Sequence, residues 1–174
     1  VRGAGHGHHD LLNLGIEAYG ANIAPELGYP HKVIGDGYYN WGKATVSHNT
    51  VVVNQMHQTR INDPADPLHF DDAGMVQIAD VDASDRYGAT DIYRRTVVMI
   101  EVNDDVSYGV DFFRVKGGND HVYSFHSQSQ NVDIQGVTLR EQKGGSYAGA
   151  SVEWKTTGMA NGYSYLNNVA RASA

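Results

Sequence analysis

Short β-type segments separated by turn residues follow one another along this chain, while helical periodicity is almost absent. The clearest segments are Ala44–Asn54, Met75–Asp82, Thr90–Val102 and Val106–Lys116. Asn103-Asp104-Asp105 joins the last two as a hairpin turn. Many short strands with polar turns are typical of antiparallel sandwiches or barrels. The pattern therefore predicts an all-β fold, an antiparallel β-sandwich.

Weaker signals complete this arrangement. Four more strands are expected at Leu11–Tyr19, His121–Ser127, Val132–Leu139 and Ser151–Lys155. The Pro-, Gly- and Asp-bearing stretches Tyr29–Tyr39 and Gln58–Asp72 are predicted to be long loops. The length of 174 residues suits a single domain over 1–174. Because the chain starts at Val1 without a signal pattern, we expect a piece of a longer polypeptide.

Composition excludes several classes of protein. The chain has no Cys, which excludes disulfides, thiolate metal sites and cysteine nucleophiles. Twenty acidic against 13 basic side chains leave a net charge of −7, which argues against a nucleic-acid partner. No run reaches the roughly 18 apolar residues that a membrane helix needs, so no membrane partner is expected either.

The densest group of chemically active side chains is Gly5–Asp10, which reads GHGHHD. In an extended strand, His6, His8 and Asp10 would project from one face and His9 from the other. Imidazoles and a carboxylate on one face suit a divalent metal or a proton-transfer site. A surface histidine cluster without a function is the competing interpretation.

Two more segments carry possible metal ligands. His48 lies in the SHNT run before an apolar stretch, and Glu26 lies in PELGY. Alone, His48 could be a core histidine bonded to the backbone, and Glu26 a solvated carboxylate. Together with His8 they would supply two nitrogens and one oxygen to zinc, with Asp10 orienting an imidazole. This prediction depends on whether the fold brings the three segments together.

The ordered motifs resemble the β-sandwich region of heparinase II/III-like polysaccharide lyases. The matching elements are HxHxD at His6–Asp10, acid-x-Gly at Glu26–Gly28, a Trp before HNTV in Trp41–Val51, and FRVKGG with FH in Phe113–His126. They occur in the family's order. One departure is Glu26, where the family usually has Asp.

The resemblance implies a fold and a set of site residues. The chain would be part of a large super-β-sandwich that an (α/α) toroid, absent from these residues, normally precedes. His8, Glu26 and His48 would bind Zn²⁺ or another divalent cation. His6 would be catalytic, facing the cleft and neutralising or contacting the substrate carboxylate. Tyr39 is the expected catalytic tyrosine, although Tyr29 and Tyr38 are alternatives for lining the cleft, and His126 is expected to contact substrate unless it only packs.

The resemblance also implies a reaction. Such enzymes cleave uronic-acid polysaccharides by β-elimination, and the main acid/base residues lie in the helical domain. The expected partners are therefore an acidic polysaccharide and that helical domain, the expected location is the periplasm or the exterior, and this chain alone should be inactive. A non-catalytic carbohydrate-binding sandwich is the main alternative, and a cupin-like metal enzyme fits the histidine spacing less well.

Two remaining groups have simpler interpretations. Arg94, Arg95 and Arg114 could form a cationic patch for a polyanion, but a solvated strand face paired with acids is the stronger expectation. His9 and His57 have no evident partners in the sequence and are expected at the surface.

Overall fold

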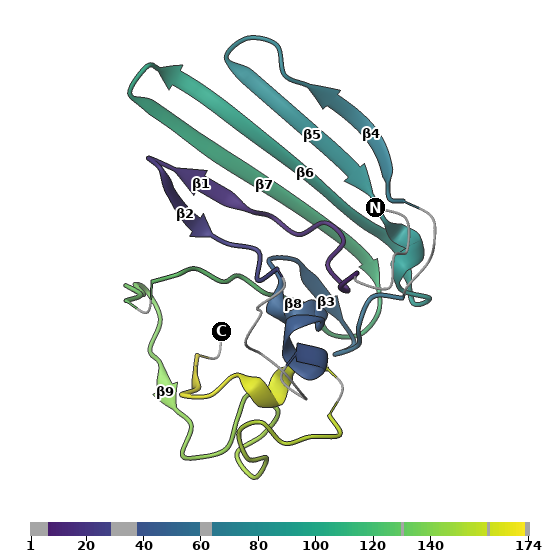
Figure 1. The fold of residues 1–174 in the computed structure, drawn as a ribbon, viewed down its shortest axis with the longest axis vertical. Coiled ribbons are helices and arrows are strands. Elements are labelled where there is room, and N and C mark those ends of the chain that lie inside the picture. Colours follow the sequence, from purple (N-terminus) through teal and green to yellow (C-terminus); the bar gives the residue numbers. More distant parts are fainter. Residues whose placement is uncertain (1–6, 29–37, 60–63, 130, 160, 173–174) are drawn as a thin grey trace.

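The structure, a computed structural model, describes residues 7–28, 38–59, 64–129, 131–159 and 161–172, with Tyr38 and Tyr39 described by their backbone alone. Its regular structure consists of antiparallel strand pairs and a few short helical turns (Figure 1). The prediction of an all-β, antiparallel fold is confirmed. No helix in the described ranges is long and apolar enough to cross a membrane.

The largest sheet has the order β4-β5-β6-β7, formed by Asp66–Asp71, Val76–Asp82, Thr90–Asn103 and Val106–Gly117. Its two long strands form the predicted hairpin, whose turn is closed by a bond from the Asp105 N–H to Asn103 Oδ1 (3.0 Å). Cross-strand pairing sets Arg95 opposite Phe113 and Arg94 opposite Arg114. Because side chains alternate along a strand, these pairs lie on opposite faces of the sheet.

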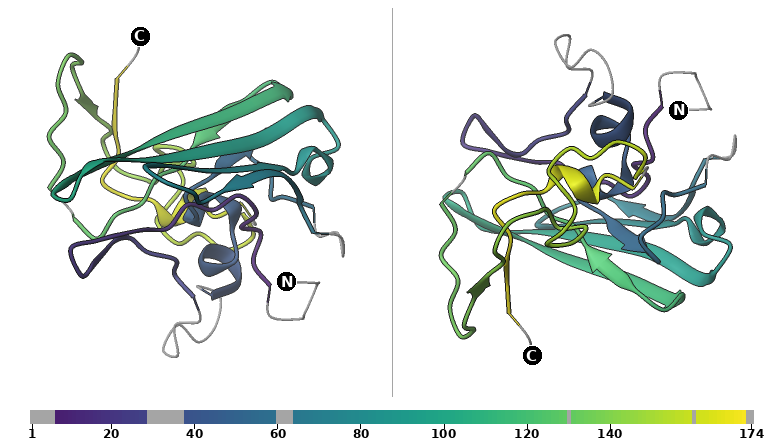
Figure 2. Two further views of the ribbon diagram at one scale, coloured as in Figure 1. Left: turned by 90° about the horizontal axis from the view of Figure 1, so that it is seen from above. Right: turned by 90° about the horizontal axis from the view of Figure 1, so that it is seen from below.

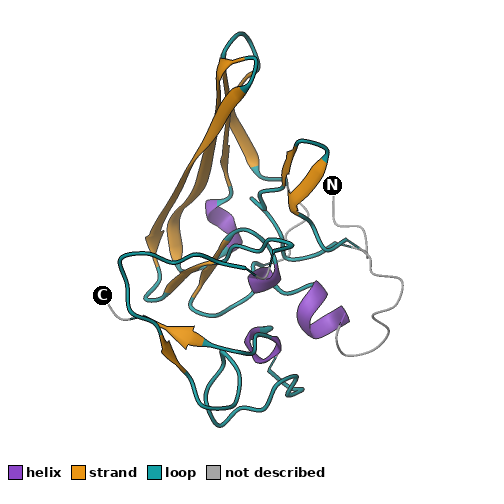
Figure 3. Ribbon diagram, turned by 90° about the vertical axis from the view of Figure 1, so that its left-hand side faces the viewer, coloured by secondary structure: helices purple, strands orange, loops and turns teal. Residues whose placement is uncertain are grey.

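The other strands form three small antiparallel pairs. They are β1 (Ile16–Ala18) with β2 (Ala21–Ala24), β3 (Val51–Val53) with β8 (His121–Tyr123), and β9 (Arg140–Glu141) with β10 (Ala170–Arg171). The helical turns are η1 (Tyr38–Gly42), η2 (Thr45–Ser47), η3 (Ser84–Arg86) and η4 (Tyr163–Tyr165). Figure 2 shows the large sheet forming one layer, with β1, β2 and η1 (purple to blue) on one side of it. The far ends of its strands project beyond the other elements (Figure 3).

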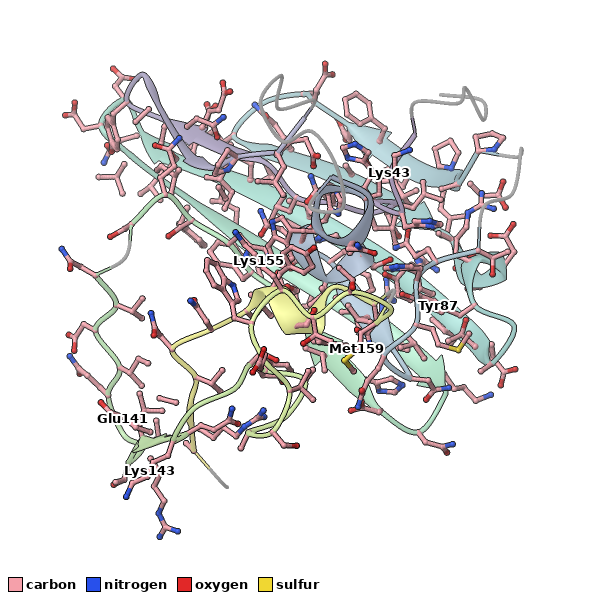
Figure 4. The ribbon with its side chains drawn as sticks, turned by 60° about the horizontal axis from the view of Figure 1, so that its bottom comes forward. Lys43, Tyr87, Glu141, Lys143, Lys155 and Met159 are labelled. Carbon is pink, nitrogen blue, oxygen red and sulfur yellow. The ribbon has the colours of Figure 1, made fainter. Side chains whose placement is uncertain are left out.

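The short strand β3 lies between two apolar clusters. Val51 and Val53 pack with Ala83, Tyr87 and Tyr93 under the large sheet. Val52 points to the other side, where it packs with Ala44, Val46 and Tyr163. Tyr87, labelled in Figure 4, meets the Tyr93 ring edge-on at a centroid distance of 5.2 Å. The VVV run is therefore apolar at every position because both faces of this strand are buried.

The predicted strand Ala44–Asn54 is wrong in its first half, which forms η2 and a turn instead. Ser47 Oγ (2.8 Å) and His48 Nδ1 (2.8 Å) both donate to the Ala44 carbonyl. Ser124 Oγ donates to the Val46 carbonyl (2.6 Å). Side chains thus satisfy the carbonyls that a neighbouring strand would otherwise satisfy, so the extended ladder begins only at Val51.

Three other expectations about elements are wrong. Val132–Leu139 is irregular and exposed throughout. An alternating apolar and polar pattern forms a stable strand only when a neighbouring strand pairs with it and another element packs on its apolar face. Ser151–Lys155 forms turns, with Lys155 at a φ of 62°. The expected loop Gln58–Asp72 contains β4, an edge strand whose six residues are all exposed. Pro67 is tolerated there because an edge strand pairs on one side only.

Arg95 is a buried structural residue rather than part of a cationic patch. Arg95 is only 3% exposed. Its guanidinium makes two hydrogen bonds of 2.8 Å to the Asp111 carboxylate. It also donates to the carbonyls of Leu12 and Asn49. Arg95 therefore ties the N-terminal segment and the SHNT segment to the large sheet. On the opposite face, Arg94 and Arg114 pair with Asp80.

Acidification should weaken this outer-face cluster. The hydrogen bond from Arg94, opposed by burial, lowers the pKa of Asp80 from 3.8 to about 2. A lowered pKa means that the stabilisation is complete above the unfolded value and is lost as the pH falls through the folded value. Asp80→Asn should therefore cost about 1–2 kcal/mol of unfolding free energy near neutral pH and flatten the acid limb between about pH 4 and 2.

Urea unfolding across this pH range measures the effect. Asp91→Asn is the matched control, because Asp91 is exposed and its one ion pair among the described residues is with the exposed Lys116 (3.0 Å). Equal stability losses for the two variants would contradict the role assigned to Asp80.

Candidate metal centre

The fold brings together the three side chains that the sequence proposed as metal ligands. His8 Nδ1 lies 3.3 Å from His48 Nε2 and 3.4 Å from Glu26 Oε1. His48 Nε2 lies 3.2 Å from the same Glu26 oxygen. Three donor atoms from segments 18 and 22 residues apart thus form a nearly equilateral triangle. Both imidazoles are buried at this point, with side chains 6% and 0% exposed, whereas that of Glu26 is 38% exposed.

The size of this triangle suits a zinc ion. Zn–N and Zn–O bonds of about 2.0–2.1 Å in a tetrahedron place neighbouring donor atoms about 3.3–3.4 Å apart. The observed separations of 3.2–3.4 Å match that spacing. Two imidazoles and one carboxylate are also a usual zinc ligand set. The donor set therefore fits the cation in both chemistry and spacing.

Asp10 belongs to the same cluster. The candidate ligand atoms of His8, Asp10, Glu26 and His48 all lie within 4.8 Å of one another. The sequence grouped Asp10 with His6 and His8 on a strand face suited to a metal, and in the zinc set it gave Asp10 the role of orienting an imidazole. The segment 7–10 is not a strand, so its side chains do not alternate as predicted. Asp10 thereby offers a carboxylate oxygen as a fourth candidate donor.

His48 is held rigidly by its own backbone neighbourhood. It directly follows η2, and its Nδ1 faces the Ala44 carbonyl at 2.8 Å. Because a carbonyl only accepts, Nδ1 must carry the hydrogen, and in the neutral ring Nε2 presents its lone pair to the cluster. This carbonyl contact fixes both the ring orientation and the tautomer that a metal requires.

Asn13 positions the carboxylate and was not identified from the sequence. Asn13 Nδ2 donates to Glu26 Oε2 (2.8 Å), while Asn13 Oδ1 accepts the Asn49 N–H (2.7 Å). The Gly28 N–H approaches the other oxygen, Oε1, at 3.3 Å. Since Oε2 is occupied by Asn13, Oε1 is the oxygen left to face the two imidazoles. Asn13 lies just after the histidine cluster, but nothing in its own pattern distinguished it from a turn residue.

The electrostatics of the cluster tie His48 to Glu26. Burial acts to lower the pKa of His48, but the hydrogen bond and charge of Glu26 outweigh it, and the pKa lies above its ordinary value. Burial acts to raise the pKa of Glu26, but His48 and the Gly28 N–H outweigh it, and this pKa is lowered. A proton and a cation compete for the same Nε2 lone pair.

The residues after His48 anchor the site to the rest of the fold. Asn49 Nδ2 donates to the Leu14 carbonyl (2.8 Å). Thr50 Oγ1 donates to the Leu11 carbonyl (3.1 Å) and lies 2.9 Å from the Tyr93 hydroxyl. The HNT motif therefore clamps the segment that follows His8 and Asp10 against the core. This explains why three consecutive polar residues are buried.

The expectation that His9 and His57 lie at the surface is wrong, because both are partly buried. His9 Nδ1 lies 2.6 Å from the Gln58 carbonyl. The backbone N–H of His9 donates to the backbone carbonyl of Lys43 (3.2 Å), a residue labelled in Figure 4. The two imidazole rings stack at a centroid distance of 4.8 Å. They form a partly buried pair.

The remaining predicted site residues are only partly described. His6 and Tyr29 lie outside the described residues, and Tyr38 and Tyr39 belong to η1 by their backbone. His126 meets Trp41 edge-on (5.7 Å between centroids), and its Nε2 contacts the Val46 carbonyl (2.7 Å). Burial lowers the pKa of His126, opposed by that carbonyl. The imidazole thus packs in the structure, and its contact with substrate stays a prediction.

Comparison with known proteins identifies one relationship. Residues 1–168 match the family described as Heparinase II/III-like, C-terminal. No curated protein and no solved structure matches the chain significantly. The matched range includes all four residues of the metal cluster and agrees with the resemblance that the ordered motifs indicated.

Proposed function

This chain belongs to the heparinase II/III-like C-terminal family, and from that premise we propose that it forms the β-sandwich part of a lyase that cleaves a uronic-acid polysaccharide by β-elimination. The family match over residues 1–168 carries the proposal. The triangle of His8, Glu26 and His48 supports a divalent cation site, with zinc as the preferred ion. The location that goes with this function is the periplasm or the exterior.

The residues of the cluster would act mainly through structure. His8, Glu26 and His48 come from three separate segments, so holding one ion would cross-link these segments. A bound zinc would supply positive charge and would hold the three segments at fixed positions relative to one another. His8 is two residues after His6, so fixing His8 restricts where the proposed substrate-contacting imidazole can reach.

The chemistry requires charge stabilisation at the substrate carboxylate. Removal of the proton α to a uronate carboxylate places negative charge on that group in the transition state. A donor such as His6 would lower this barrier, and a tyrosine such as Tyr39 would contribute to proton transfer. The remaining acid/base groups would come from the helical domain, so the chain by itself should not turn over substrate.

Reconstitution tests this function. The chain, alone and joined to the helical domain of the same protein, is incubated with alginate and glycosaminoglycans, and the absorbance of unsaturated uronate products is followed. We expect product only with the joined protein. His6→Ala in that protein should lose turnover and keep its metal. Unchanged turnover in this variant, or no product from any uronate polymer, would favour a non-catalytic carbohydrate-binding module.

Asn13→Ala should weaken metal binding without removing a ligand. Loss of the 2.8 Å bond to Glu26 Oε2 frees the carboxylate to rotate. Second-sphere losses of this kind cost about 10–100-fold in metal affinity. Competition with a chromophoric zinc chelator measures the change. Asn22→Ala, in the exposed part of β2, is the control and should bind zinc like the parent chain.

A further inference from the structure

A second concave site lies at the end of β3 and β8 that is remote from His48. This pocket encloses about 320 Å³ and is lined by Gln55, Asp120, Val122, Tyr147, Tyr163 and Arg171, together with Ala148. Gln55 follows β3, whereas His48 precedes it, so the strand separates the pocket from the metal centre. The volume is within the range of small-molecule sites and large enough for one sugar ring.

Tyr163 is the most informative residue of this pocket. The residue is 1% exposed, and its ring packs with Ala44, Val46 and Val52. Its hydroxyl has no hydrogen-bond partner among the described residues. Burial raises the pKa of this phenol, with smaller contributions from Tyr147 and Asp120, so the group remains a donor. A buried hydroxyl without a partner is costly, which points to a ligand or solvent group in the pocket.

Asp120 and Gln55 line the same pocket as Tyr163 and supply an acid and an amide. Gln55 Nε2 donates to Asp120 Oδ2 (3.2 Å), and the Asp120 N–H bonds Asn54 Oδ1 (3.2 Å). Asp120 Oδ1 has no further hydrogen bond within the described part of the chain. The carboxylate is therefore held in place with one oxygen available as an acceptor.

Arg171 supplies the cation. Its guanidinium lies over the Tyr147 ring, 4.4 Å from the centroid, and Nη2 donates to the Tyr147 carbonyl (3.0 Å). Nε contacts Gln142 Oε1 (3.4 Å). These contacts orient the guanidinium and use Nε and Nη2, which leaves Nη1 as a donor for an anion.

We propose that this pocket binds one uronic acid residue of an acidic polysaccharide, with its carboxylate at Arg171 and its hydroxyls at Asp120, Gln55 and Tyr163. The choice of sugar rests on the proposed function. Asp120 would repel a phosphate, which is close to doubly charged at neutral pH, more strongly than a single carboxylate held at Arg171, and a neutral sugar would leave Arg171 unused. A ring with one carboxylate and several hydroxyls matches the whole set, because hydroxyls both donate and accept.

Amide NMR titration of the zinc-loaded chain tests this site. Sodium D-glucuronate should shift the signals of Asp120, Ala148 and Gly162 in a saturable manner. Methyl glucoside, which lacks the carboxylate, and acetate, which lacks the hydroxyls, should bind at least about fivefold more weakly. Equal shifts with acetate, or no shift with glucuronate, would overturn the proposal.

Matched variants separate binding from folding. Tyr163→Phe removes only the unpartnered hydroxyl, so the chain should fold as well as the parent and bind glucuronate about fivefold or more weakly. Arg171→Met should weaken binding by a similar factor. Arg140→Met, which removes the charge directly opposite in β9, and Tyr165→Phe should leave binding unchanged. Binding unaltered in both Tyr163→Phe and Arg171→Met would refute the site.

The two hypotheses fail separately. Glucuronate shifts at the pocket with no lyase activity in the joined protein would contradict the proposed function and leave the sugar site intact. Lyase activity with no response at Asp120, Ala148 and Gly162 would contradict the sugar site alone.

Discussion

His48→Ala should abolish tight zinc binding by this chain. The substitution removes the one ligand whose side chain is fully buried and whose tautomer the Ala44 carbonyl fixes. Because loss of an orienting residue alone costs about 10–100-fold, loss of this ligand should weaken affinity by at least about 100-fold. The stabilisation that zinc confers on the parent chain by mass action, about 2.7 kcal/mol at a hundredfold excess over Kd, should disappear as well.

Thermal unfolding with zinc and with a chelator measures this effect. The parent chain should show a higher Tm with zinc, and the His48→Ala chain should show one Tm under both conditions. His69→Ala is the control, since His69 lies on the exposed edge strand β4 and should retain the zinc-dependent shift. A zinc-dependent shift of full size in the His48 variant would show that the cluster does not hold the ion.

Arg95→Met should destabilise the fold more than any surface substitution in the same sheet. It leaves Asp111 without its two 2.8 Å hydrogen bonds and removes the donor to the carbonyls of Leu12 and Asn49. Breaking a buried, hydrogen-bonded ion pair from one side costs about 3–5 kcal/mol. Because Leu12 and Asn49 flank the metal cluster in sequence, zinc affinity should fall along with stability.

Urea unfolding of Arg95→Met and Arg114→Met makes the comparison. Arg114 has the same charge in the same sheet, but its side chain is 52% exposed, so its loss should cost about 1 kcal/mol or less. Similar costs for the two variants would mean that Arg95 does not tie the segments together. Asp111→Asn should fall between them, because its single amide oxygen can still accept from the Tyr123 hydroxyl and one Arg95 N–H, whereas the amide nitrogen cannot accept from the second Arg95 N–H.

The parts of the fold predicted correctly are those in which local pattern and tertiary pairing agree. The hairpin of β6 and β7 is long, rich in β-branched residues and closed by a polar turn, so its local signals suffice. Val132–Leu139 has a similar alternation but no partner strand in the described part of the chain, and β4 has a poor pattern but a partner in β5. A strand depends on what lies beside it, and a single segment does not carry that information.

The candidate site divides in the same way. His8, Glu26 and His48 were recognisable because imidazoles and a carboxylate have few common uses when they occur in such motifs. Asn13 and the buried Arg95 were not, because amides and guanidinium groups acquire their roles from their neighbours. The second pocket could not be foreseen either, since it joins Gln55, Asp120 and Arg171 from three widely separated parts of the chain.

The order of residues by itself determined the all-β class, the main hairpin, the family and the residue types available for metal binding. Those properties depend on local periodicity and side-chain chemistry, which survive in the unfolded chain. Tertiary structure alone decided that three donor atoms lie 3.2–3.4 Å apart, that Asn13 holds the carboxylate and that Arg95 is buried. These are distances between segments remote in sequence, and only the packing of the two clusters around β3 sets them.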